Sequence, residues 1–151
     1  MATSWQLTVD CADPARLVEF WCDALGYVPE PAPDGWSSWL EYWLAGGLPP
    51  EELVGAEEGS GAIVDPGGLL PRIWFQEVPE GRVVKNRLHL DLSCTPGRGR
   101  MHYAERSSRL DAEVARLVAL GASVVRRNAP EGADYVAVTL QDPEGNEFCI
   151  S

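Results

Sequence analysis

Two short segments decide the fold of this chain: QLTVDC at residues 6–11 and HLDLSC at residues 89–94. Both alternate between apolar and polar residues, which is typical of half-buried β-strands. When Gln6 is aligned with His89, the apolar positions coincide, and so do the polar ones. The apolar face carries Leu7, Val9 and Cys11 in one segment and Leu90, Leu92 and Cys94 in the other. The sequence therefore predicts a duplicated module whose first strand presents one polar face.

Each predicted strand is followed by an amphipathic helix that ends in Ala-Leu-Gly. The first helix should begin at Asp13-Pro14, an N-cap residue followed by proline at the first helical position, and should close at Gly26. The second is predicted from a Ser107/Ser108 cap to Gly121. Residues 95–106, rich in glycine and arginine, are predicted to form the longer loop before it.

The duplication continues beyond the helices. Asp65-Pro66-Gly67-Gly68 and Asp142-Pro143-Glu144-Gly145 are both D-P-x-G turns, and each leads to a short apolar segment. Each half then follows the order strand, helix and three strands. The first module also carries an insert in which aromatic residues recur at helical spacing, at Trp36, Trp39 and Trp43, with Ser37/Ser38 before the helix and a turn at residues 49–52 after it. The insert could be a lid over a ligand or a helix that only covers the core.

These patterns predict an α+β fold with two tandem βαβββ modules. The mixed sheets should curl around a cup, with the helices outside and the helical insert in the first module. The length of 151 residues suits a single domain covering residues 1–151, with module one at about 1–80 and module two at about 86–151. The polar sides of the sheets are where a binding site is expected.

Composition excludes several classes of protein. A net charge of −11 argues against nucleic-acid binding, which relies on clustered basic side chains. No apolar stretch approaches the about 20 residues that cross a bilayer, and the first residues lack the pattern of a signal peptide. The four cysteines form no C-x-x-C pair, which indicates reduced thiols. These observations predict a cytoplasmic protein without disulfides, a membrane anchor or a nucleic-acid partner.

The charge is concentrated in the first half. Residues 1–71 hold twelve acidic side chains and one basic side chain, and all six tryptophans lie at or before Trp74. An acidic surface with aromatic rings beneath it could attract a cationic ligand. The alternative is a solvated acidic face over a core that contains tryptophan.

The paired pattern, the stretch from Val78 to Leu92 and the ending DPEGNEFC at residues 142–149 resemble the vicinal oxygen chelate superfamily. That superfamily includes glyoxalases, bleomycin-resistance proteins and extradiol dioxygenases. More narrowly, the chain is similar to a glyoxalase-like subgroup common in actinobacteria. The resemblance covers nearly the whole chain and implies the fold, but not the activity, because this fold carries several chemistries. Relatives are commonly homodimers, so a homodimer is expected.

The resemblance also implies positions for a divalent metal. In metal-dependent relatives each module gives one ligand from its first strand and one from its last, and these places fall on Gln6, Gln76, His89 and Cys149. Both carboxylates of the usual set are absent, so the site could be empty or hold an organic ligand instead. If a metal binds, the mixture of imidazole and thiol favours zinc or another borderline ion over magnesium. Glu147 could substitute for one ligand, because it precedes Cys149 by two residues on a strand.

Other residues are candidates for substrate binding or catalysis. His89 could ligate a metal, accept a proton or donate a hydrogen bond; alternatively it is a structural histidine paired with Asp91. The predicted polar faces also hold the candidate substrate-binding residues Thr8, Trp74, Asp91 and Glu147. His102 falls in the predicted loop, where no chemistry is expected. No P-loop, nucleophile elbow or dinucleotide-binding motif is present.

Three functions remain open from the sequence. The first is a metal-dependent lyase, isomerase or dioxygenase acting on a small oxygenated substrate. The second is a non-catalytic binding protein, including a resistance protein that sequesters a cationic aromatic compound. The third is a metal-free enzyme in which His89 is the base. Common to all three is a glyoxalase-like protein that binds a small molecule.

Overall fold

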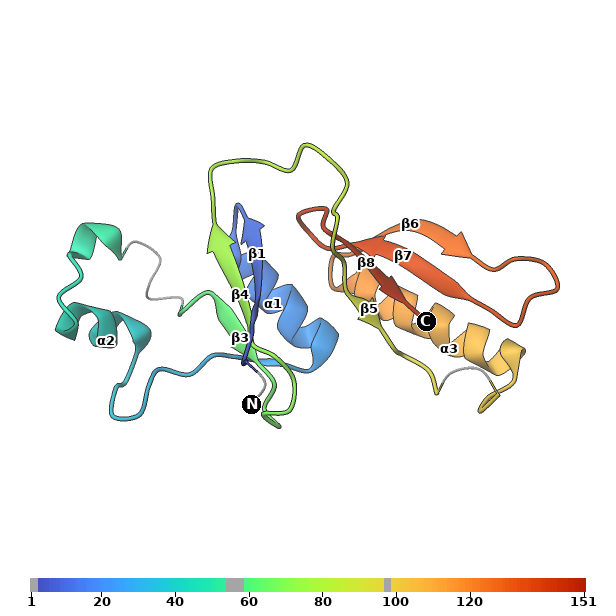
Figure 1. The fold of residues 1–151 in the computed structure, drawn as a ribbon, viewed down its shortest axis with the longest axis horizontal. Helices are drawn as coiled ribbons and strands as arrows, with labels where there is room; N and C mark the ends of the chain where they lie inside the picture. The colour runs from blue at the N-terminus through green and yellow to red at the C-terminus, as the bar shows by residue number, and fades with distance from the viewer. Residues whose placement is uncertain (1–2, 54–58, 97–98) are drawn as a thin grey trace. The chain divides into compact units, whose positions relative to one another are not determined.

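The computed structural model describes residues 3–53, 59–96 and 99–151. The chain forms two compact units, Met1–Gly81 and Arg82–Ser151, and each contains one βαβββ module (Figure 1). The predicted α+β class and its tandem modules are confirmed. None of the helices in the described residues combines the length and the apolar character needed to cross a membrane.

The first unit is a four-stranded mixed sheet with a helix on one face and the insert between its second and third strands. Its strands run in the order β1-β4-β3-β2, with β1 and β4 parallel and the other neighbours antiparallel. Its elements are β1 (Leu7–Cys11), α1 (Pro14–Leu25), β2 (Val28–Pro29), α2 (Trp39–Ala45), the 3-10 helix η1 (Pro50–Glu52), β3 (Ala62–Val64) and β4 (Ile73–Glu77).

The second unit repeats this topology without the insert. Its strands run in the order β5-β8-β7-β6, again with only the first pair parallel. Its elements are β5 (Asp91–Leu92), α3 (Tyr103–Ala119), β6 (Ser123–Asn128), β7 (Ala137–Gln141) and β8 (Glu147–Ile150). The shared strand order is the structural counterpart of the sequence duplication.

In each unit the helix covers the apolar face of its own sheet, which leaves the other face for polar side chains. Leu17, Phe20 and Trp21 of α1 are buried together with the β4 residues Ile73 and Phe75. In the second unit the fully buried side chains come from the helix and from the two central strands, namely Leu110, Leu117, Val138, Leu140, Phe148 and Ile150. Alternation along the strands turns the remaining side chains away from the helices.

The first helix and the insert form where the sequence predicts. The carboxylate of Asp13 accepts a hydrogen bond from the backbone N–H of Arg16 at 3.1 Å, and Gly26 ends the helix with a φ of 72°. In the insert, the hydroxyl of Ser38 accepts from the backbone N–H of Glu41 at 3.1 Å. Both caps satisfy N–H groups that the first turn of a helix leaves without partners.

The start of α3 corrects the sequence prediction. The helix begins at Tyr103 with His102 as N-cap, so the last residues of the predicted loop 95–106 are helical and Ser107 and Ser108 lie inside the helix rather than capping it. Arg106 explains the early start, because its buried guanidinium donates a hydrogen bond to Asp134 at 2.5 Å. Anchoring by this pair holds the first turn without a side-chain cap.

Both D-P-x-G segments form the predicted turns, each before the last strand of its module. The carboxylate of Asp142 accepts from the backbone N–H groups of Glu144 at 3.0 Å and Asn146 at 2.9 Å. The carboxylate of Asp65 accepts from Gly67 at 2.9 Å and from Leu69 at 2.8 Å. These hydrogen bonds fix where β4 and β8 start.

The strand predicted at residues 89–94 is shorter than expected, because β5 contains only Asp91 and Leu92. His89 and Leu90 precede it, yet the carbonyl of Leu90 still accepts from the backbone N–H of Cys149 at 2.8 Å. The side chains from His89 to Asp91 therefore remain beside β8.

Leu110→Ala should lower the free energy of unfolding by about 2–4 kcal/mol, because the fully buried Leu110 side chain would leave a cavity between α3 and its sheet. Val118→Ala on the same helix is the control, since Val118 is 44% exposed and its truncation should change stability by less than about 0.5 kcal/mol. Urea denaturation followed by circular dichroism measures both. Equal effects of the two substitutions would contradict the described core.

Candidate functional site

Strand pairing in the second unit gathers chemically active side chains on the sheet face opposite α3. The parallel register places Asp91 opposite Cys149, and the antiparallel register places Thr139 opposite Cys149. His89 lies two residues before Asp91, so its side chain falls on the same face. The cluster thus joins the segment at β5 to β7 and β8, which follow it in the chain only after α3 and β6.

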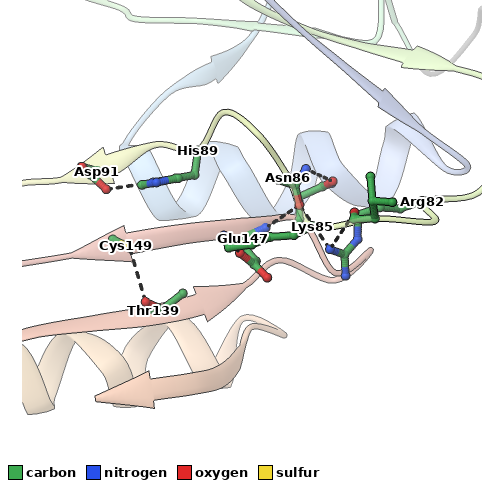
Figure 2. A network of polar contacts seen from close by, with 10 residues as sticks. Arg82, Lys85, Asn86, His89, Asp91, Thr139, Glu147 and Cys149 are labelled. Carbon is green, nitrogen blue, oxygen red and sulfur yellow. Dashed lines mark hydrogen bonds and ion pairs between the residues drawn. The ribbon is translucent and has the colours of Figure 1, made fainter. Parts of the chain in front are cut away.

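The cluster is compact (Figure 2). One ring nitrogen of His89, one carboxylate oxygen of Asp91 and the Sγ atom of Cys149 all lie within 4.8 Å of one another. The Nδ1 atom of His89 and the Oδ1 atom of Asp91 are 3.1 Å apart, and the Sγ atom of Cys149 is 3.5 Å from the Oγ1 atom of Thr139. Side-chain exposures of 39% for His89 and 73% for Asp91 leave the donors accessible to a ligand from solvent.

The chemistry of these donors fits a divalent metal. Imidazole, carboxylate and thiolate are the three ligand types that zinc accepts, and three protein ligands are the usual number where a fourth position stays open to substrate. Asp91 supplies one negative charge and Cys149 a second when it binds as a thiolate, so the two would neutralise a divalent cation. A soft thiolate favours zinc or another borderline ion over magnesium.

Glu147 lies on the same face but is held by a cation. Its carboxylate forms an ion pair with the Lys85 ammonium. The hydrogen bond from Lys85 is the largest cause of a lowered pKa of the Glu147 carboxyl, and Arg82 and His89 add smaller lowering effects against desolvation. This pairing makes Glu147 a less available metal ligand than Asp91.

The segment before β5 is fastened to the start of β8 by side-chain hydrogen bonds (Figure 2). The Oδ1 atom of Asn86 accepts from the backbone N–H of Glu147 at 3.2 Å, and the Nδ2 atom of Asn86 donates to Asn146 at 3.4 Å. Together with the Lys85–Glu147 ion pair, these contacts hold the segment that leads to His89 against the start of β8. They position the cluster rather than contribute donors to it.

In the first unit the structure gives Gln6 a different environment. The Nη1 atom of Arg72 donates to the Oε1 atom of Gln6 at 2.7 Å, while the rest of the guanidinium binds both carboxylate oxygens of Glu30 at 2.7 Å each. The hydrogen bond from Arg72 is the main cause of a lowered pKa of the Glu30 carboxyl. The oxygen that Gln6 would offer to a metal is therefore already engaged by the Arg72 guanidinium.

The other candidates of the first unit lie along β1 and β4. Thr8 pairs with Trp74, and Asp10 pairs with Gln76, so the polar face is formed as the alternation predicts. Gln76 lies beside Asp10, which is four residues beyond Gln6 on the neighbouring strand. At about 3.3 Å per residue, Gln6 and Gln76 are therefore about 13 Å apart along the strand direction. Thr8 corresponds to Asp91 in the repeat. Thr8 pairs with Trp74 and Asp91 pairs with Cys149, so the residue that matches Cys149 is Trp74 and not Gln76.

Sequence reasoning assigned Asp91 to the substrate-binding face and did not count it among the metal donors. The signal was present in the i, i+2 spacing of His89 and Asp91, which puts an imidazole and a carboxylate on one side of an extended segment. The roles of Arg72 and Lys85 carried no such signal, because their partners lie far along the chain.

Comparison with known proteins gives one family. The model of a family described as "Glyoxalase-like domain" matches residues 6–151 of this chain. No curated protein matches the chain.

Several solved structures share the fold at low sequence identity. The fosfomycin resistance protein FosX from Listeria monocytogenes has a TM-score of 0.58 and 11% identity, over 99% of this chain and 90% of that chain. A mutant of FosX complexed with Mn(II) and a dihydroxypropylphosphonic acid has a TM-score of 0.56 and 12% identity, over the same shares of both chains. A glyoxalase/bleomycin resistance protein/dioxygenase family enzyme from Burkholderia phytofirmans has a TM-score of 0.55 and 15% identity, over 96% of this chain and 94% of that chain.

Lys85→Met should make the protein less stable at pH 7 but not at pH 3. The pKa of Glu147 is lowered in the folded state. The ion pair therefore stabilises the protein fully at pH values above the ordinary pKa of a glutamate, and this stabilisation is lost as the pH falls through the pKa of the folded state. Urea midpoints at both pH values test this. The control Arg87→Met removes the same charge from the same segment, and a deficit of Lys85→Met that persisted at pH 3 would contradict the pairing.

Proposed function

Because this chain belongs to the glyoxalase-like domain family, we propose that it binds a divalent metal ion through His89, Asp91 and Cys149 and, with it, a small oxygen-bearing molecule. The observation that carries the proposal is the convergence of three different donor atoms within 4.8 Å of one another on the polar face of the second sheet. The Mn(II) complex of the FosX mutant, which has the same fold, adds support.

Each residue of the cluster has a defined task in this proposal. Cys149 and Asp91 bring the negative charge, and His89 is oriented by its contact with Asp91 at 3.1 Å. Thr139 contacts the sulfur of Cys149 and limits its rotation. When bound, such an ion would polarise an oxygen atom of the substrate as a Lewis acid.

The donor set narrows the reaction class. A site with a thiolate, an imidazole and one carboxylate suits zinc, which has no redox chemistry of its own. A lyase or isomerase acting on a small oxygenated substrate is therefore favoured over a dioxygenase. The exposure of the His89 and Asp91 side chains leaves these donors open to such a substrate.

We also propose a homodimer in the cytoplasm. Strand β6 supports the dimer, since among the described strands it pairs with β7 alone and every one of its residues is exposed, which leaves an edge for a second copy. None of the four cysteines is in a disulfide, which agrees with a reducing compartment. Light scattering during size-exclusion chromatography should give twice the mass of one chain; the mass of a single chain would contradict the dimer.

Titration of chelator-treated protein with zinc should reveal one ion per chain. His89→Ala and Cys149→Ser should each weaken zinc binding by at least about tenfold, because a three-donor site loses a ligand in either variant. Cys94→Ser is the matched control, since the Cys94 sulfur contacts the carbonyl of Leu92 and takes no part in the cluster. Cobalt in place of zinc should give a thiolate charge-transfer band that Cys149→Ser abolishes and Cys94→Ser retains.

Acetohydroxamate, which offers two adjacent oxygen atoms, is the probe for the small molecule. It should bind the zinc-loaded protein and lose affinity when the metal is removed, and calorimetry measures both. The metal half of the proposal is overturned by the absence of stoichiometric zinc uptake. The small-molecule half is overturned by hydroxamate affinity that does not depend on the metal.

A further inference from the structure

The first unit contains a cavity of about 430 Å³ that lies apart from the polar face of its sheet. Its wall includes the connection from β1 to α1, and Phe75 and Glu77 at the end of β4; from the insert it includes Trp43, Leu48, Glu52 and Leu53. Phe75 belongs to the side of β4 that is buried beneath α1, whereas Trp74 and Gln76 belong to the opposite side. The cavity is therefore a different site from the one that the resemblance implies for Gln6 and Gln76.

The insert gives the cavity an ordered aromatic wall. The ring of Trp43 lies in the wall and packs against Trp39, with the ring centroids 5.2 Å apart. Trp39 is fixed in turn, because its Nε1 atom donates to the carbonyl of Glu30 at 2.9 Å. Leu48 and the buried Leu53 extend this apolar surface. An apolar wall held in place before binding lowers the entropic cost of taking up a ligand.

The charged side chains of the cavity all have one sign. Asp13, Glu52 and Glu77 line it, and among the described residues of its wall there is no lysine, arginine or histidine. Asp13 caps α1, but the side chains of Glu52 and Glu77 form no hydrogen bond or ion pair with any residue that the structure describes. Two carboxylates beside an aromatic ring are the groups that recognise an ammonium ion, by ion pairing and by cation–π attraction.

We propose that this cavity binds a small organic amine whose ammonium group lies between Glu52 and Glu77 and whose apolar body packs on Trp43 and Leu48. The volume lies within the range of about 300–1,000 Å³ that holds a small molecule. The excess of acidic residues in residues 1–71 raises the local concentration of cations and so assists the encounter. This site is independent of the proposed metal site, because the two lie in different units.

A pair of probes that differ in charge tests the proposal. Calorimetry should show saturable binding of phenylbutylamine, while the neutral phenylbutanol, of nearly the same shape, should bind at least about fivefold more weakly. Raising sodium chloride from about 20 to 300 mM should weaken binding of the amine and leave that of the alcohol unchanged, because salt screens only the charged interaction.

Neighbouring glutamates of η1 provide a matched pair of variants. Glu52→Gln should weaken amine binding about threefold or more, whereas Glu51→Gln should leave it unchanged, because both residues are exposed in the same 3-10 turn and only Glu52 lines the cavity. Glu52→Gln combined with Glu77→Gln should weaken binding about tenfold. The zinc affinity of each variant should equal that of the wild type, which shows that the second unit is intact.

Three results would overturn the proposal: no saturable amine binding at up to about 5 mM, equal affinity for the amine and the alcohol, or equal effects of Glu51→Gln and Glu52→Gln. Trp43→Leu provides a separate check, since it keeps an apolar wall but removes the aromatic ring. Its affinity should fall for the amine more than for the alcohol. Loss of zinc uptake with amine binding retained would contradict only the metal site.

Discussion

The parallel pairing of the first and last strands within each module is the constraint on which the candidate metal site depends. It places Asp91 opposite Cys149, and a shift by one residue would turn these side chains toward α3. The register is held by burial on the other face, where Phe148 and Ile150 of β8 are almost completely inaccessible. The hydrophobic core thus sets the register of the polar cluster, and the contacts of Lys85 and Asn86 with the start of β8 hold the segment that leads to His89.

Most of the fold could be predicted because its signals are local. The alternation in the first strands, the caps of α1 and α2 and the two D-P-x-G turns each depend on residues a few positions apart. The start of α3 could not be predicted, since it depends on the ion pair between Arg106 and Asp134, which lies in the connection from β6 to β7. The short length of β5 likewise follows from the pairing of Asp91 and Leu92 with β8, which the alternation alone does not reveal.

The candidate site also combines features that are local in sequence with features that depend on distant partners. Its residue types and their face followed from strand alternation and from the resemblance, but the state of each side chain depends on partners far along the chain. Gln6 contacts Arg72, and Glu147 contacts Lys85, across more than sixty residues in each case. These two cations engage two of the predicted donors, while strand pairing brings His89 and Cys149 together with Asp91, which was not among the predicted metal donors.

Arg72 and Glu147 occupy equivalent places in the repeat. Arg72 lies beside Gln6, Glu147 lies beside His89, and Gln6 and His89 are themselves equivalent. The duplicated architecture therefore carries opposite charges at one matching position. Two separate copies of one module would have to carry the same side chain there. Two modules within one polypeptide are free of that requirement, so a cation can stand beside β1 where an anion stands beside β5.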